Sequence, residues 1–187
     1  MNIMVVGVGG QGTLLTSRII GKMALEAGYD VKLSEVHGMA QRGGSVVTYV
    51  RFGQHVDEPT VEEGQADMLL AFERLEAMRY AHYLKKDGVL IVNDCKINPM
   101  TVTIGAAQYP DNILENLQKD HTVYAIKAND IAEKLGNSKV VNSIVLGLAA
   151  KYMDFKKEEW LEVLSAVVPQ KTVQINTLAF ETGYNHQ

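Results

Sequence analysis

Residues 3–12 read IMVVGVGGQG, a short apolar run that leads directly into a glycine-rich turn. The run Ile3–Val6 is typical of a buried parallel strand. After the turn the apolar period changes, because Leu15, Ile19 and Met23 recur at the spacing of an amphipathic helix. Gly28 then stands where a helix commonly ends. We therefore predict a strand over Ile3–Val6, a glycine-rich turn directly after it, and a helix over residues 11–27.

A second strand is expected over Val31–Val36, which completes a βαβ unit and indicates a parallel sheet with a right-handed crossover. Apolar and β-branched runs predict further strands over Ser45–Phe52, Asp67–Phe72, Gly88–Asn93, Val102–Ile104 and Thr122–Ile126. Helical composition predicts helices over Arg74–Leu84, Asp130–Leu135, Ser143–Met153, Lys157–Val167 and Thr172–Tyr184. The predicted fold is α/β and Rossmann-like, with a mostly parallel sheet, helices on both faces and a helical C-terminal third. No repeat or linker divides the sequence, so one domain over residues 1–187 is expected.

The composition excludes several kinds of partner. The chain has 187 residues and a net charge of −4. It therefore lacks the positive electrostatic field that would attract nucleic acids or anionic membranes. Its one cysteine, Cys95, can form no internal disulfide and is too few for an iron–sulfur cluster held by this chain alone. The N-terminus lacks a basic leader region, and the longest apolar stretch is far shorter than the ~20 residues that span a bilayer. A cytoplasmic location is expected.

The glycine-rich turn has the spacing G-x-G-x-x-G between a strand and a helix. In such a turn Gly7 permits the tight bend, Gly9 lets a ligand approach the backbone, and Gly12 lets the helix pack on the strand. The start of the helix offers unpaired N–H groups that suit a phosphate or pyrophosphate. Glu35 follows at about the 20-residue distance of a carboxylate that binds ribose hydroxyls. The alternative is a tight turn without a ligand, and the motif does not choose between NAD, FAD and coenzyme A (CoA).

A second glycine-rich loop follows the second predicted strand, where residues 37–45 read HGMAQRGGS. At the carboxyl edge of the sheet this loop would lie beside the first turn. Arg42 could then bind phosphate or carboxylate in a bidentate manner, unless it is simply solvated. No catalytic residue can be assigned, and the histidines lack the spacing of metal ligands. The candidate ligand-binding residues are Gly7, Gly9, Gly10, Gln11, Gly12, Thr13, Glu35, Gln41, Arg42, Gly43 and Gly44.

The two loops, together with YVRFG at residues 49–53, resemble the gamma-type domain of 2-oxoacid:ferredoxin oxidoreductases. The resemblance is greatest to the enzymes of this family that act on indolepyruvate. Its specific part lies within residues 7–53, and the similar length extends it over the whole chain.

The resemblance implies a complex that oxidatively decarboxylates a 2-oxoacid, here an arylpyruvate such as indolepyruvate, to an acyl-CoA and passes electrons to ferredoxin. Thiamine diphosphate and the [4Fe–4S] clusters are then expected on a larger partner subunit. This chain would contribute CoA or phosphate binding and subunit contacts, and would be inactive alone. A free-standing NAD(P)-dependent oxidoreductase and a non-catalytic nucleotide-binding module remain open. A dehydrogenase needs a catalytic acid or base, and none can be identified in the sequence that follows the predicted sheet.

Overall fold

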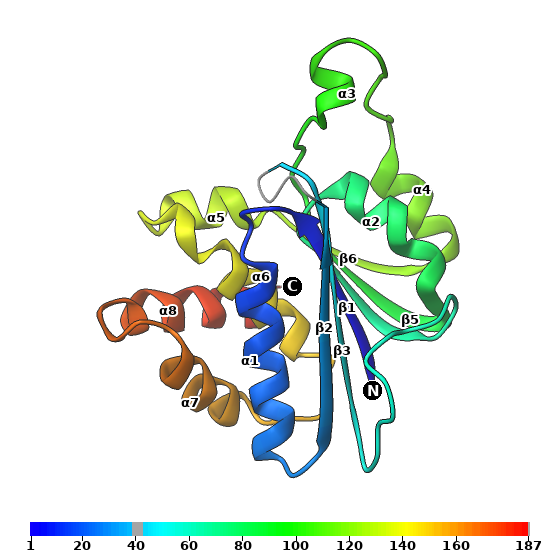
Figure 1. Ribbon diagram of the computed structural model, residues 1–187. Helices are drawn as coiled ribbons and strands as arrows, with labels where there is room; N and C mark the ends of the chain where they lie inside the picture. Colours follow the sequence, from blue (N-terminus) through cyan, green and yellow to red (C-terminus); the bar gives the residue numbers. More distant parts are fainter. Residues whose placement is uncertain (39–42, 187) are drawn as a thin grey trace.

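A central six-stranded sheet, with strand order β2-β3-β1-β4-β5-β6, organises the molecule in the computed structural model, which describes residues 1–38 and 43–186 (Figure 1). The strands are β1 (Asn2–Val8), β2 (Asp30–His37), β3 (Ser45–Gly53), β4 (Ala66–Ala71), β5 (Leu84–Asn93) and β6 (Thr122–Ile126). The helices are α1 (Thr13–Glu26), α2 (Arg74–Tyr80), α3 (Met100–Thr103), α4 (Ile113–Asp120), α5 (Ala128–Lys134), α6 (Val141–Ala150), α7 (Lys157–Val167) and α8 (Val173–Tyr184). Short 3₁₀ turns cover Ala81–Tyr83, Ser138–Val140 and Gln170–Thr172.

The predicted βαβ unit is present, but its two strands are not neighbours. β1 pairs in parallel with β4 and antiparallel with β3, and β3 pairs antiparallel with β2. β2 therefore runs parallel to β1 with β3 between them. The chain turns back after β2 and returns as β3, which fills the space between β2 and β1. The sheet is consequently mixed, although every strand except β3 runs in the same direction.

One predicted strand is wrong, and two helices, α3 and α4, were not predicted. Residues 102–104 belong to a short helical segment around α3, which projects from the body of the molecule (Figure 1). Their β-branched side chains favour a strand locally, but no neighbouring strand pairs with this exposed segment. Helix α4 was missing from the prediction, although Ile113 and Leu117 are spaced as on one helix face and both are buried.

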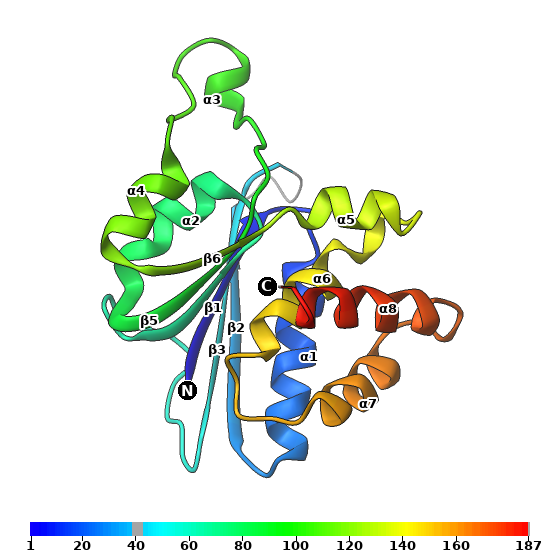
Figure 2. The same ribbon diagram turned by 180° about the vertical axis from the view of Figure 1, so that it is seen from behind.

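Helices cover both faces of the sheet, as predicted. Along β1 the side chains alternate between the two faces, because successive residues of a strand point in opposite directions. Ile3 and Val5 belong to the core beneath α1 and α6–α8, whereas Met4 and Val6 belong to the core beneath α2 and α4. Figure 2 shows α5–α8 gathered on one side of the sheet and α2 and α4 on the other. No helix of the described chain combines the length and apolar character of a membrane-spanning segment.

Helices α6 and α8 approach each other closely enough for their backbones to touch. A Cβ atom added to Gly147 would lie 2.0 Å from the carbonyl oxygen of Phe180, and one added to Gly183 would lie 1.9 Å from that of Ile144. Only glycine fits at these two positions. Almost all of α6 is buried, so this contact fixes a helix at the centre of the larger core.

The substitution Gly147→Ala should destabilise the fold by at least ~1–3 kcal/mol, because the new methyl group overlaps the backbone of α8. Urea unfolding of the chain, followed by circular dichroism, measures this change. Gly21→Ala in α1 is the matched control, since its methyl group would meet its nearest neighbours, Leu33 and Val31 of β2, at an ordinary contact distance of 3.7 Å. That substitution should instead stabilise the protein by about 0.5–1 kcal/mol. Equal stability of Gly147→Ala and the wild type would contradict the close α6–α8 contact.

Candidate functional site

The two glycine-rich loops lie side by side at the carboxyl edge of the sheet, as predicted from the sequence. The backbone N–H of Gly9 donates a hydrogen bond to the carbonyl of Gly44 (2.8 Å), and that of Gly43 donates one to the carbonyl of Gly9 (3.4 Å). Gln41 and Arg42 lie outside the described residues, so their part in the site stays a prediction. The loops meet near the point where the helices after β1 and β4 leave to opposite faces, which is where open α/β sheets bind ligands.

Helix α1 begins without a side-chain cap. Gly12 is its N-cap residue at φ +85°, and no acidic residue lies in the first turn. The N–H groups of Thr13, Leu14 and Leu15 have no acceptor among the described residues. Gly10, at φ +104°, bends the chain away without placing a side chain over these groups. The helix start therefore presents free donors and the positive end of the helix dipole.

A cavity of about 450 Å³ opens beside this helix start, and we call it the β2-side cavity. It is lined by Gly9, Gly10, Gly12, Thr13, Leu14, Glu35, His37 and Val46. Glu35 thus lies on the same cavity as the glycine-rich turn, in the arrangement that its sequence distance indicates. The His37 Nδ1 atom contacts only the neighbouring Gly38 carbonyl (3.1 Å) among the described groups. No nucleophile or carboxylate hydrogen-bonds to His37 within that part of the chain.

Gln11 joins the ends of two strands. Its Oε1 atom accepts a hydrogen bond from the N–H of Val8 (2.7 Å), and its Nε2 atom donates one to the carbonyl of Phe72 (2.8 Å). Val8 ends β1, and Phe72 directly follows β4. The amide of Gln11 therefore holds the glycine-rich turn against the sheet, and its predicted contact with a ligand remains untested.

The thiol of Cys95 is partly buried, and its Sγ atom lies 3.8 Å from Gln11 Nε2. Its Sγ atom donates to the carbonyl of Phe72 (3.2 Å), which also accepts from Asn93 Nδ2 (3.2 Å). Burial, followed by the nearby carboxylate of Glu73, raises the pKa of Cys95 to about 11. At neutral pH the residue is a protonated hydrogen-bond donor rather than a nucleophile.

Glu73 was not singled out from the sequence, yet it organises the neighbouring strand end. One carboxylate oxygen accepts from the N–H groups of Leu75 (2.6 Å) and Glu76 (3.0 Å) and so caps α2. The other accepts from the N–H of Ile97 (3.1 Å) and from the hydroxyl of Tyr109. Burial raises the pKa of Tyr109, and its hydrogen bond to Glu73 adds to the effect. Glu73 thereby ties both ends of the projecting α3 segment to the sheet.

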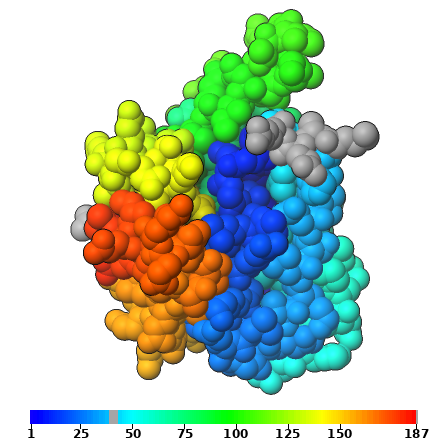
Figure 3. Space-filling model, turned by 60° about the vertical axis from the view of Figure 1, so that its left-hand side comes forward, coloured from blue at the N-terminus to red at the C-terminus, as the bar shows by residue number. Residues whose placement is uncertain are grey.

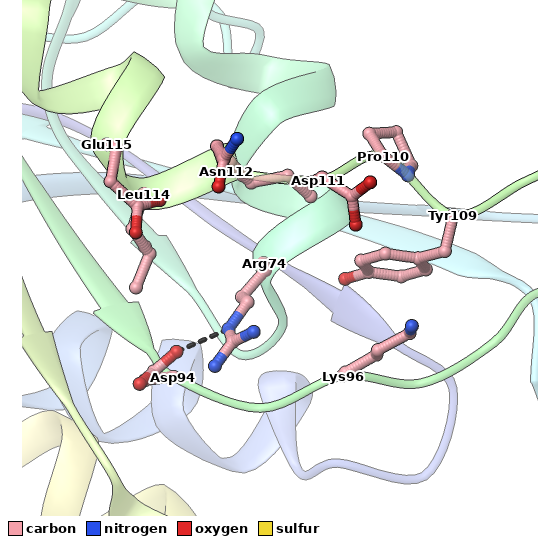
Figure 4. A pocket seen from close by; sticks show the side chains of 10 residues that line it. Arg74, Asp94, Lys96, Tyr109, Pro110, Asp111, Asn112, Leu114 and Glu115 are labelled. Atoms are coloured by element: carbon pink, nitrogen blue, oxygen red, sulfur yellow. Dashed lines mark hydrogen bonds and ion pairs between the residues drawn. The ribbon is translucent and has the colours of Figure 1, made fainter.

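A separate cavity of about 280 Å³ lies between α2 and α4 (Figure 4). The guanidinium of Arg74 donates to Asp94, which raises the pKa of Arg74, and the ammonium of Lys96 lies 4.5 Å from the ring centre of Tyr109. Asp111 and Glu115 line the same space. Two cations and three carboxylates leave a net negative charge, so this cavity does not favour an anion.

Comparisons with known proteins identify the family. The family model described as pyruvate ferredoxin/flavodoxin oxidoreductase matches residues 2–186. The indolepyruvate oxidoreductase subunit IorB of Archaeoglobus fulgidus is 45% identical over 190 residues, covering 99% of this chain and 94% of that protein. The protein of the same name from Thermococcus kodakarensis is 42% identical over 188 residues, covering 97% of this chain and 93% of that protein.

Solved structures show the same fold. A keto/oxoacid ferredoxin oxidoreductase gamma subunit from Geobacter sulfurreducens superposes with a TM-score of 0.72 at 25% identity, covering 98% of this chain and 95% of that chain. The 2-oxoglutarate:ferredoxin oxidoreductase of Magnetococcus marinus, solved with 2-oxoglutarate, coenzyme A and succinyl-CoA bound, superposes with a TM-score of 0.74 at 20% identity. That match covers 98% of this chain but 30% of the longer one. From the family match over residues 2–186 and the full-length relatives above 40% identity, we conclude that this protein belongs to the pyruvate ferredoxin/flavodoxin oxidoreductase family.

Proposed function

We propose that this chain is the gamma-type subunit of a 2-oxoacid:ferredoxin oxidoreductase that acts on indolepyruvate or a related arylpyruvate. The complex removes CO₂ from the 2-oxoacid, transfers the acyl group to CoA and passes the electrons to ferredoxin. Four relatives of 37–45% identity, each named as an indolepyruvate oxidoreductase subunit, support this substrate class. Thiamine diphosphate and the iron–sulfur clusters belong to the larger partner subunit in this proposal, and the single cysteine of this chain agrees with that division.

The role of this chain within the complex is to bind the phosphate groups of CoA at the glycine-rich turn. The observation that carries this role is the uncapped start of α1, where the N–H groups of residues 13–15 have no acceptor among the described residues and where Thr13 and Leu14 line the β2-side cavity. Backbone N–H groups and the helix dipole together favour a phosphate at such a position. A cavity of about 450 Å³ is also within the usual size range of ligand sites, roughly 300–1,000 Å³.

A free-standing NAD(P)-dependent oxidoreductase is the second candidate. Glu35 favours it, because a carboxylate in the same cavity as a glycine-rich turn is the usual partner of a nicotinamide dinucleotide's ribose. Against it, His37 is the one titratable imidazole of the β2-side cavity and has no catalytic partner among the described residues.

Purification of the tagged chain from its native cells distinguishes the two functions. We expect it to carry a larger partner with broad iron–sulfur absorption, and the complex to reduce ferredoxin or a viologen dye when given indolepyruvate and CoA. A colourless chain that elutes alone and binds NAD or NADP would refute the subunit function and favour the dehydrogenase.

Leu14→Glu tests the phosphate-binding role. The new carboxylate would lie in the first turn of α1. There it would interact favourably with the positive end of the helix dipole, but it would repel a phosphate in the β2-side cavity. We expect the Kd of the assembled complex for CoA to rise by about tenfold or more, with no loss of thermal stability. Titration calorimetry measures the affinity, and Leu14→Gln, which has a similar shape without the charge, should change it by less than about threefold. Equal CoA affinity in Leu14→Glu and Leu14→Gln would contradict phosphate binding at this turn.

The thiol of Cys95 should react slowly with alkylating reagents, because its pKa of about 11 leaves little thiolate at neutral pH. Alkylation by iodoacetamide, followed by mass spectrometry, should be slower than that of glutathione by on the order of a hundredfold and should accelerate as the pH rises. Since folding favours the protonated thiol, stability should also fall as the pH rises from about 8.5 towards 11. Cys95→Ala should leave turnover by the complex within about twofold of the wild type. Rapid alkylation at neutral pH, or loss of turnover in Cys95→Ala, would show that the thiol takes part in the reaction.

A further inference from the structure

The segment over residues 97–109 projects from the body of the molecule, and we call it the arm. It follows β5, contains α3 and returns to the body before α4. Figure 3 shows the green segment that includes the arm standing clear of the surface around it. Met100 and Ile104 are 72% and 68% exposed, the highest values among the exposed large apolar side chains of the described residues. Residues 97–108 contribute no side chain to either hydrophobic core, so the apolar side chains of the arm do not serve the fold.

The arm carries no charge, although charged residues are common elsewhere in the chain. Its sequence, INPMTVTIGAAQY, contains no acidic or basic side chain, whereas 21% of the residues of the whole chain are charged. A contiguous exposed apolar surface is typical of an interaction site, and the centres of protein–protein interfaces are depleted of charged residues. The composition and exposure of the arm together indicate a surface that another protein covers.

Hydrogen bonds hold the arm in one conformation although its side chains pack on little else. At the tip, the carbonyl of Thr101 accepts from the N–H of Ala106 (2.9 Å) and so closes the turn after α3. At the base, the carboxylate of Glu73 accepts from the N–H of Ile97 (3.1 Å) and from the hydroxyl of Tyr109. A segment that is ordered before it binds loses less conformational entropy on binding. The arm is therefore prepared for insertion into a partner.

The arm leaves the sheet at the same edge as the glycine-rich turn. β1, β4 and β5 are parallel neighbours, so their carboxyl ends lie together, and the arm follows the end of β5. The base of the arm also borders the second glycine-rich loop, because Ile97 and Pro99 line a cavity of about 200 Å³ with Gly43 and Gly44. A large protein that faces the glycine-rich turn would therefore meet the arm as well.

We propose that the arm docks into an apolar groove, without charged side chains at its centre, on the larger subunit that holds the thiamine diphosphate. This inference rests on the proposed function, in which CoA at the glycine-rich turn must reach the acyl group that the larger subunit supplies. That subunit then has to face the carboxyl edge of the sheet, where the arm projects. A second copy of this chain is a poorer match, because the other exposed large apolar side chains of the described residues are spread over α1, β2, α2, β6 and α8.

Met100→Glu and Ile104→Glu test the inference, since each places a carboxylate on the arm without touching the core. Sedimentation of the purified complex at a series of dilutions, with this chain labelled at its tag, measures the Kd between the chain and the larger subunit. We expect each variant to raise that Kd by about tenfold or more, because the new charge would be buried without a partner. Met100→Leu keeps the side chain apolar and should change the Kd by less than about twofold. The matched control is Leu25→Glu, because Leu25 is 59% exposed at the far end of α1, and it should also leave the Kd within about twofold.

The outcomes separate the inference from the proposed function. An unchanged Kd in both Met100→Glu and Ile104→Glu would overturn the inference and leave the proposed function standing. An equal rise in Leu25→Glu would also overturn it, because the weakening would then not be specific to the arm. So would loss of a dimer of this chain with the larger subunit still bound, since the arm would then contact a second copy. A wild-type chain that purifies without a larger partner would refute the proposed function and the inference together. Thermal unfolding of each variant serves as the folding control, since these exposed substitutions should leave the midpoint within about 2 °C of the wild type.

Discussion

The side-chain amide of Gln11 accepts a hydrogen bond from the backbone of Val8 and donates one to the carbonyl of Phe72, so one side chain joins the ends of β1 and β4. Strand ends leave backbone groups that must find partners, and a glycine-rich turn has few side chains with which to supply them. Gln11 meets this need from within the turn itself. The start of α1 is thereby held at a fixed position against the sheet, next to the β2-side cavity.

Local pattern was sufficient to predict several elements but not how they pair. The limits predicted for Lys157–Val167 agree with α7, and the apolar run Ile3–Val6 lies within β1. The place of β3 was not predictable in the same way, because a strand that is apolar on both faces can lie between any two neighbours. Residues 102–104 have the composition of a strand, but a strand also needs a partner, and the projecting α3 segment has none.

The same distinction between local sequence pattern and long-range packing applies to the candidate site. Gly12 and Glu35 are recognisable because a motif relates them at a fixed distance along the sequence, and both line the β2-side cavity. The contact of Asn142 with the turn could not be recognised, because Asn142 comes from α6, far along the chain, and only the packing of α6 brings it against Gly12. Glu73 and its contact with Tyr109 escaped notice for the same reason. The close approach of α6 to α8 at Gly147 therefore bears on the glycine-rich turn as well as on stability, since it helps to position α6, which contacts Gly12 through Asn142.

The reversed direction of β3 has a consequence for how this family can diversify. Because β2 and β3 are antiparallel neighbours, β2 ends at His37 and β3 begins at Ser45 at the same edge of the sheet, where Gly43 and Gly44 contact the glycine-rich turn. A loop anchored in this way can lengthen at little entropic cost, roughly 0.6 kcal/mol for each doubling of its length, without displacing a strand. In a wholly parallel sheet the same segment would have to cross to the opposite edge, and an insertion would disturb the crossover. The hairpin thus provides a place where the length and sequence of the chain can change while the sheet remains as it is.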